Sequence, residues 1–301
     1  MTVSLGVVLP TTLPSWSDGQ DVRALLDLAV TAESLGFSSV WVGDTLLRPV
    51  VEPLTVLSAV AAVTRRVGLG TATLLPSLRR PVQTASALAS LDRLSGGRLT
   101  VAVGAGFPRR SEREYAISEV PWERRFARLD ETVGLWRSLW AGRRVEFGSP
   151  PEQVPPVLPP FRPAGPAVWL GGASPSALER AGRLYDGWLP YPPSASTYAS
   201  GLQAVRAGGR DVTPALFVTV LITPDGSAAL DAYVRAAYGM PLSVVSTIQL
   251  LVAGPAGHVR SVLGEFVTAG ARHLVIRIAA LDFETQRAQL ELLTEAVPGR
   301  Y

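Results

Sequence analysis

The side chains that could carry out chemistry are few in this sequence, and the missing types narrow the choice of reaction. The 301 residues include no cysteine, no lysine and no asparagine, and only two histidines, His258 and His273. These absences exclude a thiol nucleophile, an iron–sulfur cluster, a lysine Schiff base and a Walker A loop. The histidines form no HExxH pattern, so we predict no metal site and interpret both as structural. If the chain is an enzyme, a bound cofactor must supply the difficult chemistry.

Polar residues at the end of one β-branched run are the first candidates for a site. Asp44 and Thr45 follow the run Ser39–Val42, where a carboxylate could face the ligand-binding end of a sheet. The alternative is that Asp44 is a turn residue that binds neighbouring backbone N–H groups. Further along, Arg79 or Arg80 could meet a phosphate or an acidic substrate, or the two could form an ordinary surface pair.

Glycines and other small residues mark the ends of three further runs. Gly171 and Gly172 lead into a helix that Ser174 would cap and that Pro175 would begin. The free N–H groups at such a helix end form an anion site, so we interpret this turn as a phosphate site, with a plain tight turn as the alternative. Two other runs end in stretches of small residues, 70–76 and 104–108, where a ligand could approach the main chain closely.

These loops connect short β-branched runs that alternate with amphipathic helical patterns along the whole chain. The runs predicted as strands are 4–9, Ser39–Val42, 67–73, Leu99–Val103, 168–170, Gly187–Leu189, 215–221 and His273–Ile278. The predicted helices are 21–35, 53–64, 82–94, 122–140, 174–181, two that begin at 227 and 256, and 284–293. This order predicts a (β/α)8 TIM-like barrel whose site lies in the loops after the strands. A doubly wound open sheet is the alternative, but residues 10–16 lack the glycine fingerprint that it would want.

We expect one domain over residues 1–301, because the same alternation continues on both sides of a proline-rich stretch at 146–166. An interdomain linker is the alternative interpretation of that stretch. The net charge is only +3 and the arginines alternate with acids, which argues against nucleic-acid binding. No apolar stretch approaches the ~20 residues that cross a bilayer, and the first residues carry no basic segment typical of a signal peptide. We therefore expect a cytoplasmic protein that neither binds nucleic acid nor enters a membrane.

The order of these motifs resembles the bacterial-luciferase-like superfamily. The most specific stretch is 88–106, which is similar to that family's signature A-x-x-D-x-L-S-x-G-R with a glycine-rich end. The stretches that support it are 39–44, 66–71, 125–131, 169–177 and 181–188. The resemblance runs from about residue 3 to residue 188, and more loosely to the C-terminus.

The resemblance implies a luciferase-like barrel that uses reduced FMN or the deazaflavin F420 at its open end, as a monooxygenase or a reductase. By this resemblance the cofactor ring packs over Ala72 and Thr73 near Asp44, and the Ala72–Thr73 peptide bond is cis. The cofactor-binding residues that it implies are Thr71, Ala72, Thr73, Gly104, Ala105, Gly106, Gly171, Gly172, Ala173 and Ser174. The catalytic candidates are Asp44 and Thr45.

Two positions depart from the dehydrogenases of that family. Thr45 stands where they have a catalytic histidine, and Phe107 stands where their fourth-strand loop often has a glutamate. Because this histidine and glutamate are missing, we do not expect alcohol oxidation. Oxygen activation and F420-driven reduction are the two reactions that we still expect. A barrel that has lost redox function and binds a ligand, or catalyses a cofactor-free rearrangement, is the alternative.

The remaining predictions concern the substrate and the partners. We expect a largely apolar organic substrate, because the loops offer large apolar groups and few charges. The residues predicted to line its pocket are Trp16, Leu47, Phe107, Trp188 and Arg277. Further expectations from the resemblance are a separate flavin or F420 reductase and a homodimer.

Overall fold

The computed structural model describes residues 3–12, 21–148, 150–224 and 226–297. Eight parallel strands form a closed barrel, as the sequence predicts. In order around the ring they are β1 (Ser4–Val8), β2 (Ser39–Val42), β3 (Gly68–Leu74), β4 (Leu99–Val103), β7 (Ala167–Gly171), β8 (Gly187–Leu189), β9 (Thr213–Ile222) and β11 (His273–Ile278). Pairing of β8 with β9 and of β11 with β1 closes the ring.

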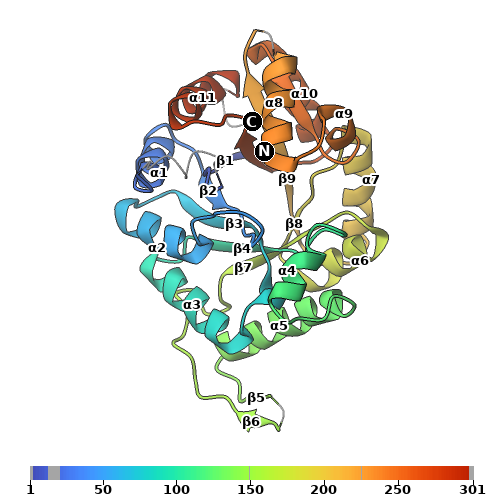
Figure 1. The fold of residues 1–301 in the computed structure, drawn as a ribbon. Coiled ribbons are helices and arrows are strands. Elements are labelled where there is room, and N and C mark those ends of the chain that lie inside the picture. The colour runs from blue at the N-terminus through green and yellow to red at the C-terminus, as the bar shows by residue number, and fades with distance from the viewer. Residues whose placement is uncertain (1–2, 13–20, 149, 225, 298–301) are drawn as a thin grey trace.

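Helices surround this barrel (Figure 1). The long ones are α1 (Ala24–Ser34), α2 (Pro53–Val63), α3 (Pro81–Leu94), α5 (Arg125–Trp140), α6 (Pro175–Leu184), α7 (Ala195–Arg206), α8 (Gly226–Tyr238), α10 (Ala256–Thr268) and α11 (Phe283–Ala296). The short ones are α4 (Glu112–Ile117), α9 (Leu242–Val245) and the 3₁₀ turn η2 (Pro76–Leu78). The predicted helices are confirmed to within a few residues at their ends, whereas α4, α7 and α9 were not predicted.

One strand beyond the eight was also not predicted. Strand β10 (Leu251–Gly254) pairs with the C-terminal part of β9, from Thr219 to Ile222. Strand β9 is longer than β8, and its other edge is already paired with β11. Strand β10 therefore pairs with the part of β9 that extends beyond β8. It brings the residues before Leu251 close to the open end of the barrel.

The proline-rich stretch contains a small hairpin, formed by β5 (Glu146–Phe147) and β6 (Glu152–Gln153). Figure 1 shows it projecting away from the barrel, beyond the ring of helices. After the hairpin, Arg162 anchors the chain to α3, because its guanidinium lies 3.2 Å from a carboxylate oxygen of the buried Asp92.

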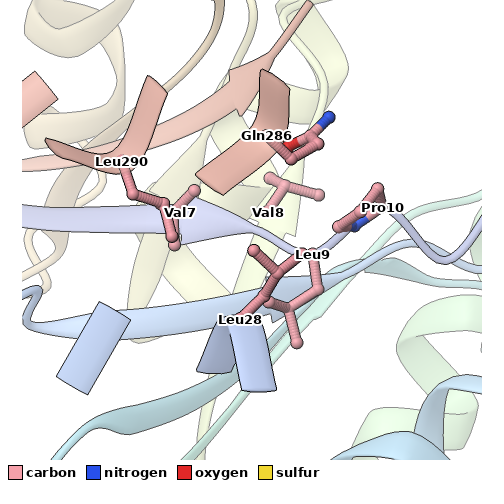
Figure 2. A pocket seen from close by; sticks show the side chains of 7 residues that line it. All are labelled: Val7, Val8, Leu9, Pro10, Leu28, Gln286 and Leu290. Atoms are coloured by element: carbon pink, nitrogen blue, oxygen red, sulfur yellow. The ribbon is translucent and has the colours of Figure 1, made fainter. Parts of the chain in front are cut away.

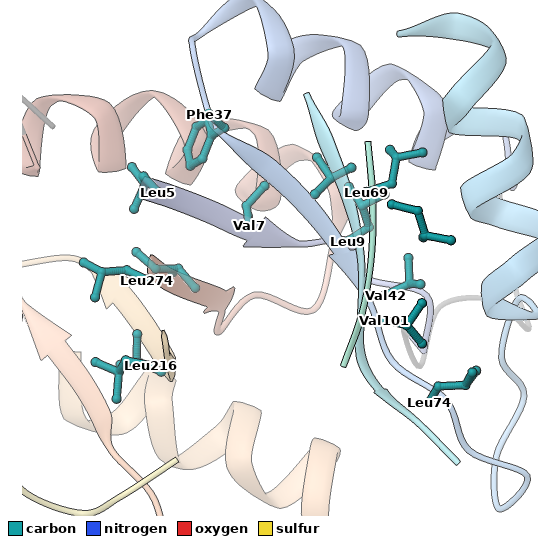
Figure 3. Packing of buried hydrophobic residues seen from close by; sticks show 14 of the residues in the cluster. Leu5, Val7, Leu9, Phe37, Val42, Leu69, Leu74, Val101, Leu216 and Leu274 are labelled. Atoms are coloured by element: carbon teal, nitrogen blue, oxygen red, sulfur yellow. The ribbon is translucent and has the colours of Figure 1, made fainter. Parts of the chain in front are cut away.

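Apolar side chains fill two layers. The larger layer lies between the strands and the helices, and Figure 3 shows part of it around β1, β2 and β3. The second cluster draws residues from strands all around the ring, and only the inside of the barrel can bring these together: Val8, Trp41, Ala102, Trp169, Leu189, Ala215, Phe217 and Val275. Glycine makes room for the indoles, because a Cβ on Gly70 would lie 2.1 Å from an atom of Trp41.

His273 belongs to the inside of the barrel, near its N-terminal end. Its Nε2 atom lies 2.8 Å from the hydroxyl of Ser39, which also accepts a hydrogen bond from the indole of Trp41. Burial lowers the pKa of His273 to about 4, so the imidazole is neutral at physiological pH. His258, in contrast, is exposed on α10. Both positions agree with the structural interpretation of the two histidines.

The carboxylate of Asp92 and the guanidinium of Arg98, both in the signature stretch, hold helices and loops together. Arg98 donates hydrogen bonds to the carbonyl oxygens of Ala61, Thr64, Val67 and Ser95, and so ties the end of α2 to the end of α3. Together with the contact between Asp92 and Arg162, this places Asp92 and Arg98 at the N-terminal side of the barrel, whereas the glycine-rich end of the signature follows β4 at the other side. The N-terminal side stabilises such folds, and the opposite side carries their sites.

Candidate active site

The ends of β3, β4 and β7 meet at one residue, Thr73. The Ala72–Thr73 peptide bond is cis, as the resemblance implied. A Cβ on Gly104 would come within 2.7 Å of the Thr73 hydroxyl oxygen, and one on Gly171 within 3.0 Å of its methyl group. Side chains at either glycine would therefore collide with Thr73. This part of the barrel mouth, which we call the backbone seat (Ala72, Thr73, Gly104, Gly171), presents main chain rather than side chains.

The N-terminus of α6 lies directly beside the backbone seat. Gly172 has φ +112°, a conformation that side chains rarely adopt, and the hydroxyl of Ser174 accepts a hydrogen bond from the N–H of Ala177. Among the described residues, the N–H groups of Ala173, Ser174 and Ser176 have no hydrogen-bond partner. Free N–H groups at the positive end of a helix dipole bind anions. The donor set therefore fits the phosphate of a flavin or deazaflavin.

A groove continues from this helix end between α6 and α7. It has a volume of about 360 Å³ and is lined by Ala173, Leu178, Trp188, Pro192, Thr197, Ser200 and Gly201. A second cavity, of about 10 Å³, lies between β1, α1 and α11, and Figure 2 shows that its lining is almost entirely apolar. The second cavity holds no more than about one water molecule. The groove beside α6 is the one with room for part of a ligand.

The carboxylate of Asp44 is already bound by its neighbours. One oxygen accepts the N–H of Leu75 at 3.0 Å, and Arg79 lies 3.1 Å and 3.3 Å from the two oxygens. Arg79 also lies 2.9 Å from Glu52. The Asp44 side chain is 7% exposed; burial raises the pKa of its carboxyl, and Arg79 opposes that rise. Asp44 thus joins the loops after β2 and β3, and Arg79 is part of an ion pair rather than a free surface cation.

Thr45 has a partner that sequence analysis missed. Its hydroxyl donates to a carboxylate oxygen of Glu114 at 2.6 Å, and the same oxygen accepts the N–H of Leu46 at 2.9 Å. Glu114 lies on α4, is buried, and is 69 positions away in the chain. No local pattern could indicate a contact over that separation. The loop after β2 is therefore held from two sides, by Arg79 and by Glu114.

Two predicted site residues are buried. Trp188 is 1% exposed and stacks on Tyr198 of α7, with 5.2 Å between the ring centroids. It lies between the barrel and the helices, because its strand neighbour Leu189 is the one that faces inward, and there it lines the groove beside α6. Thr71 is fully buried, and its hydroxyl donates to the carbonyl of Ala102. Trp188 therefore borders the groove rather than the inside of the barrel, and the Thr71 side chain is not exposed to a ligand.

The other predicted pocket residues lie at the open end where the structure describes them. Phe107 is 42% exposed, and its ring centroid lies 5.5 Å from that of Tyr191. Leu47 is half-buried in the loop after β2. Arg277 donates to the hydroxyl of Tyr238 at 2.7 Å. Trp16 lies outside the described residues.

Comparison with known proteins places the chain in a family. Residues 3–278 match the family described as luciferase-like monooxygenase. An F420-dependent glucose-6-phosphate dehydrogenase of Nakamurella multipartita is 38% identical over 181 residues, which are 55% of this chain and 51% of that protein. The chain thus spans about half the length of the curated relatives of this kind that it matches first.

Solved structures share the fold over almost their whole length. The monooxygenase RslO1 from Streptomyces bottropensis has a TM-score of 0.81 and 25% identity, with 98% of each chain covered. An F420-dependent secondary alcohol dehydrogenase, solved with an F420–acetone adduct, has a TM-score of 0.78 and 19% identity, with 99% of this chain and 100% of that chain covered. Within the described residues, no helix is long and apolar enough to cross a membrane. The chain belongs to the luciferase-like monooxygenase family.

Proposed function

We propose that this chain is an oxidoreductase that binds F420 or reduced FMN at the open end of its barrel and acts on a small organic substrate. The observation that carries the proposal is the backbone seat next to the free N–H groups of α6. A flat ring needs main chain without protruding side chains, and a phosphate needs unpaired donors. The two features lie side by side, since Gly171 ends the seat and Gly172 begins the turn into α6.

The residues that would hold the cofactor follow from this arrangement. The ring would rest on Ala72, Thr73 and Gly104, and the phosphate would accept hydrogen bonds from the N–H groups of Ala173 and Ser174. When bound, the cofactor supplies the hydride or the activated oxygen that the chain's own side chains cannot. Ala105 and Gly106 would line the same region from the loop after β4, although Ala105 is buried.

Of the two cofactors, F420 has the broader support. The first relatives by sequence similarity are named F420-dependent enzymes. FMN is the second candidate, because the family model is described as luciferase-like monooxygenase and a diketocamphane monooxygenase solved with FMN shares the fold, with a TM-score of 0.78 and 15% identity. The loop residues do not repeat the histidine and glutamate of the family's dehydrogenases, because Thr45 and Phe107 stand there. Reduction or oxygenation of the substrate therefore fits this chain better than alcohol oxidation.

A titration of the purified protein with F420 and with FMN tests the proposal, with cofactor fluorescence as the readout. We expect saturable binding of at least one of them. Gly172→Val should weaken it by tenfold or more, because the new side chain disturbs the turn at φ +112° that presents the free N–H groups.

Gly209→Val is the matched control for that variant. Gly209 has φ +84° and open space around it, on the turn after α7, so the substitution imposes a similar backbone cost away from the mouth. It should leave cofactor binding unchanged. If neither cofactor binds the wild-type protein, the redox-inactive barrel becomes the better description of this chain.

The partners of the proposed activity are further proposals. A separate F420 or flavin reductase would supply the reduced cofactor, and the chain would act as a homodimer in the cytoplasm. Light scattering after gel filtration measures the oligomeric state directly. Electron transfer from a purified reductase, followed by absorbance of the cofactor, tests the first of these proposals.

A further inference from the structure

A group of cationic and hydrogen-bonding side chains lies at the open end of the barrel, away from the backbone seat. Arg277, near the end of β11, donates to the hydroxyl of Tyr238 at 2.7 Å, and its guanidinium carbon lies 4.8 Å from the ring centroid of Phe217. Arg110, from the loop after β4, places its guanidinium carbon 5.8 Å from the ring centroid of Tyr238. Two arginines therefore converge on one phenol.

A third arginine completes the group. Arg48, from the loop after β2, interacts electrostatically with both Arg110 and Arg277. Burial and the repulsion from these two cations lower the pKa of Arg48. None of the ion pairs among the described residues involves Arg48, Arg110 or Arg277. No carboxylate of the described residues therefore lies within ion-pair distance of these three guanidinium groups.

Two buried donors without partners lie in the same place. Gln249, just before β10, is 9% exposed, and its side chain lies near the Tyr238 phenol and helps to lower the pKa of that phenol; no acceptor of the described residues, however, meets the hydrogen-bond geometry for its Nε2 atom. The hydroxyl of Thr219 is fully buried and also lacks a partner there. Thr219 is the register partner of Arg277 in the pairing of β9 with β11. An unpaired buried polar group costs about 1–3 kcal/mol, so two beside an arginine cluster indicate a missing ligand.

We propose that these residues, the arginine pocket (Arg48, Arg110, Thr219, Tyr238, Gln249, Arg277), bind an anionic group of the organic substrate, a carboxylate or a phosphate. The inference rests on the proposed function and defines its substrate class more narrowly. An anion would neutralise the three guanidinium groups and accept hydrogen bonds from the amide and the hydroxyl that lack partners. Guanidinium groups match both kinds of anion in geometry.

The position of the pocket assigns it to the substrate rather than to the cofactor phosphate. In the ring of strands, β11 lies opposite β4, and β4 with β3 and β7 carries the backbone seat. The free end of α6 follows β7, three places around the ring from β11. The exposed ring of Phe107 and the ring of Tyr191 lie in loops at the same open end. A substrate with an apolar body and an acidic head fits this mouth, which makes the expectation of a largely apolar substrate more specific.

Tyr238 shows the strength of the local field. Burial by itself would raise the pKa of its phenol, but Arg277, Gln249 and Arg110 together outweigh burial and hold that pKa below its ordinary value. The same field would attract the anionic head of a substrate to the mouth.

Calorimetric titration of the cofactor-free protein with inorganic phosphate, and separately with acetate, tests the pocket in a buffer free of both anions. We expect saturable binding of at least one anion, and the one that binds more tightly identifies the head group as phosphate or carboxylate. Arg48→Gln and Arg110→Gln should each weaken that binding by tenfold or more, which is about 1.4 kcal/mol. Both residues lie in loops, so these variants are safer for folding than substitution of the partly buried Arg277.

Two controls separate this pocket from other cationic or anion-binding surfaces. Arg144→Gln removes the same charge at an exposed position near the proline-rich hairpin and should leave anion binding unchanged. Gly172→Val disturbs the α6 site, so it should remove only phosphate that binds at the free N–H groups there and should keep the binding event that Arg48→Gln removes. Anion binding lost in Gly172→Val but kept in Arg48→Gln, or no saturable binding of either anion, would overturn the proposal. Because no cofactor is present, this result is independent of the outcome of the F420 and FMN titrations.

Discussion

The substitution Asp44→Asn separates the two roles that a carboxylate at the barrel mouth can have. A group that contacts the cofactor or the substrate would lose function on this change, whereas a group that joins loops would lose stability. The structure favours the second role, because the hydrogen bonds of Asp44 go to Leu75 and Arg79. Asparagine keeps one carbonyl oxygen as an acceptor but loses the charge.

The expected loss of stability in Asp44→Asn depends on the ion-pair partner that Arg79 keeps. Removing one partner of a buried ion pair costs about 3–5 kcal/mol when the other charge is left alone. Arg79 still has Glu52 at 2.9 Å, and its side chain is 23% exposed, so it is not left alone. The loss is then that of a hydrogen bond to a charged group, about 1.5–3 kcal/mol. Cofactor affinity should change by less than tenfold, since the backbone seat is untouched.

Denaturant unfolding of Asp44→Asn, Arg79→Gln and the double variant measures the pair directly. The double variant should be less destabilised than the sum of the two single ones, by about 1 kcal/mol or more. Asp211→Asn, at an exposed position with no hydrogen bond or ion pair among the described residues, is the control for the chemical change. An Asp44→Asn protein of unchanged stability that binds its cofactor at least tenfold more weakly would refute this reasoning and assign Asp44 a direct contact.

Three further predictions concern stability. Glu114→Gln should speed hydrogen exchange at the Leu46 amide, which Glu114 binds at 2.9 Å, and lower the free energy of unfolding by about 1–3 kcal/mol; unchanged exchange would contradict the contact. Burial lowers the pKa of His273 to about 4, so the unfolded chain binds the proton first and stability should fall by about 2 kcal/mol between pH 7 and pH 5. His273→Phe should remove that fall, measured by denaturant unfolding at both pH values, and the exposed His258→Gln should retain it. Gly70→Ala should destabilise by about 2 kcal/mol or more, because its Cβ would lie 2.1 Å from Trp41, whereas Gly134→Ala, with open space around it, should not.

The sequence predicts the barrel well because its elements are repetitive and local. Short β-branched apolar runs and amphipathic runs of period 3.6 recur in alternation, and the closed ring of eight strands is confirmed. Helix α7 was missed although its signals were present: Ser194 caps it, and Tyr198, Leu202 and Val205 form its buried face. Strand β10 was missed because it is only four residues long and pairs with a part of β9 that β8 does not reach.

The parts of the site that sequence analysis missed depend on contacts between distant residues. Glu114 reaches Thr45 across 69 positions, and nothing in the local pattern of either loop indicates it. The orientation of Trp188, between the barrel and the helices, could not be predicted for a different reason. Strand β8 has three residues, all apolar or glycine and all buried, so its alternation gives no sign of which one faces inward. Gly70 and Gly187 make room for Trp41 and Trp169 inside the barrel. Each glycine lies on a different strand from its tryptophan, so the sequence alone does not show that the two meet.

The charged residues of the signature and the residues that would choose the substrate lie on opposite sides of this barrel. Asp92 and Arg98 of the signature join helices and loops at the N-terminal side. Arg48 and Arg110 lie in loops at the other end of the strands, Arg277 lies near the end of β11, and all three are outside the signature. Substitution of Arg48 or Arg110 changes the charge of the mouth without touching the contacts of Asp92 and Arg98. A shared signature therefore supports the same fold and cofactor chemistry in two chains, while the substrate of each must be argued from the loops that only its own structure brings together.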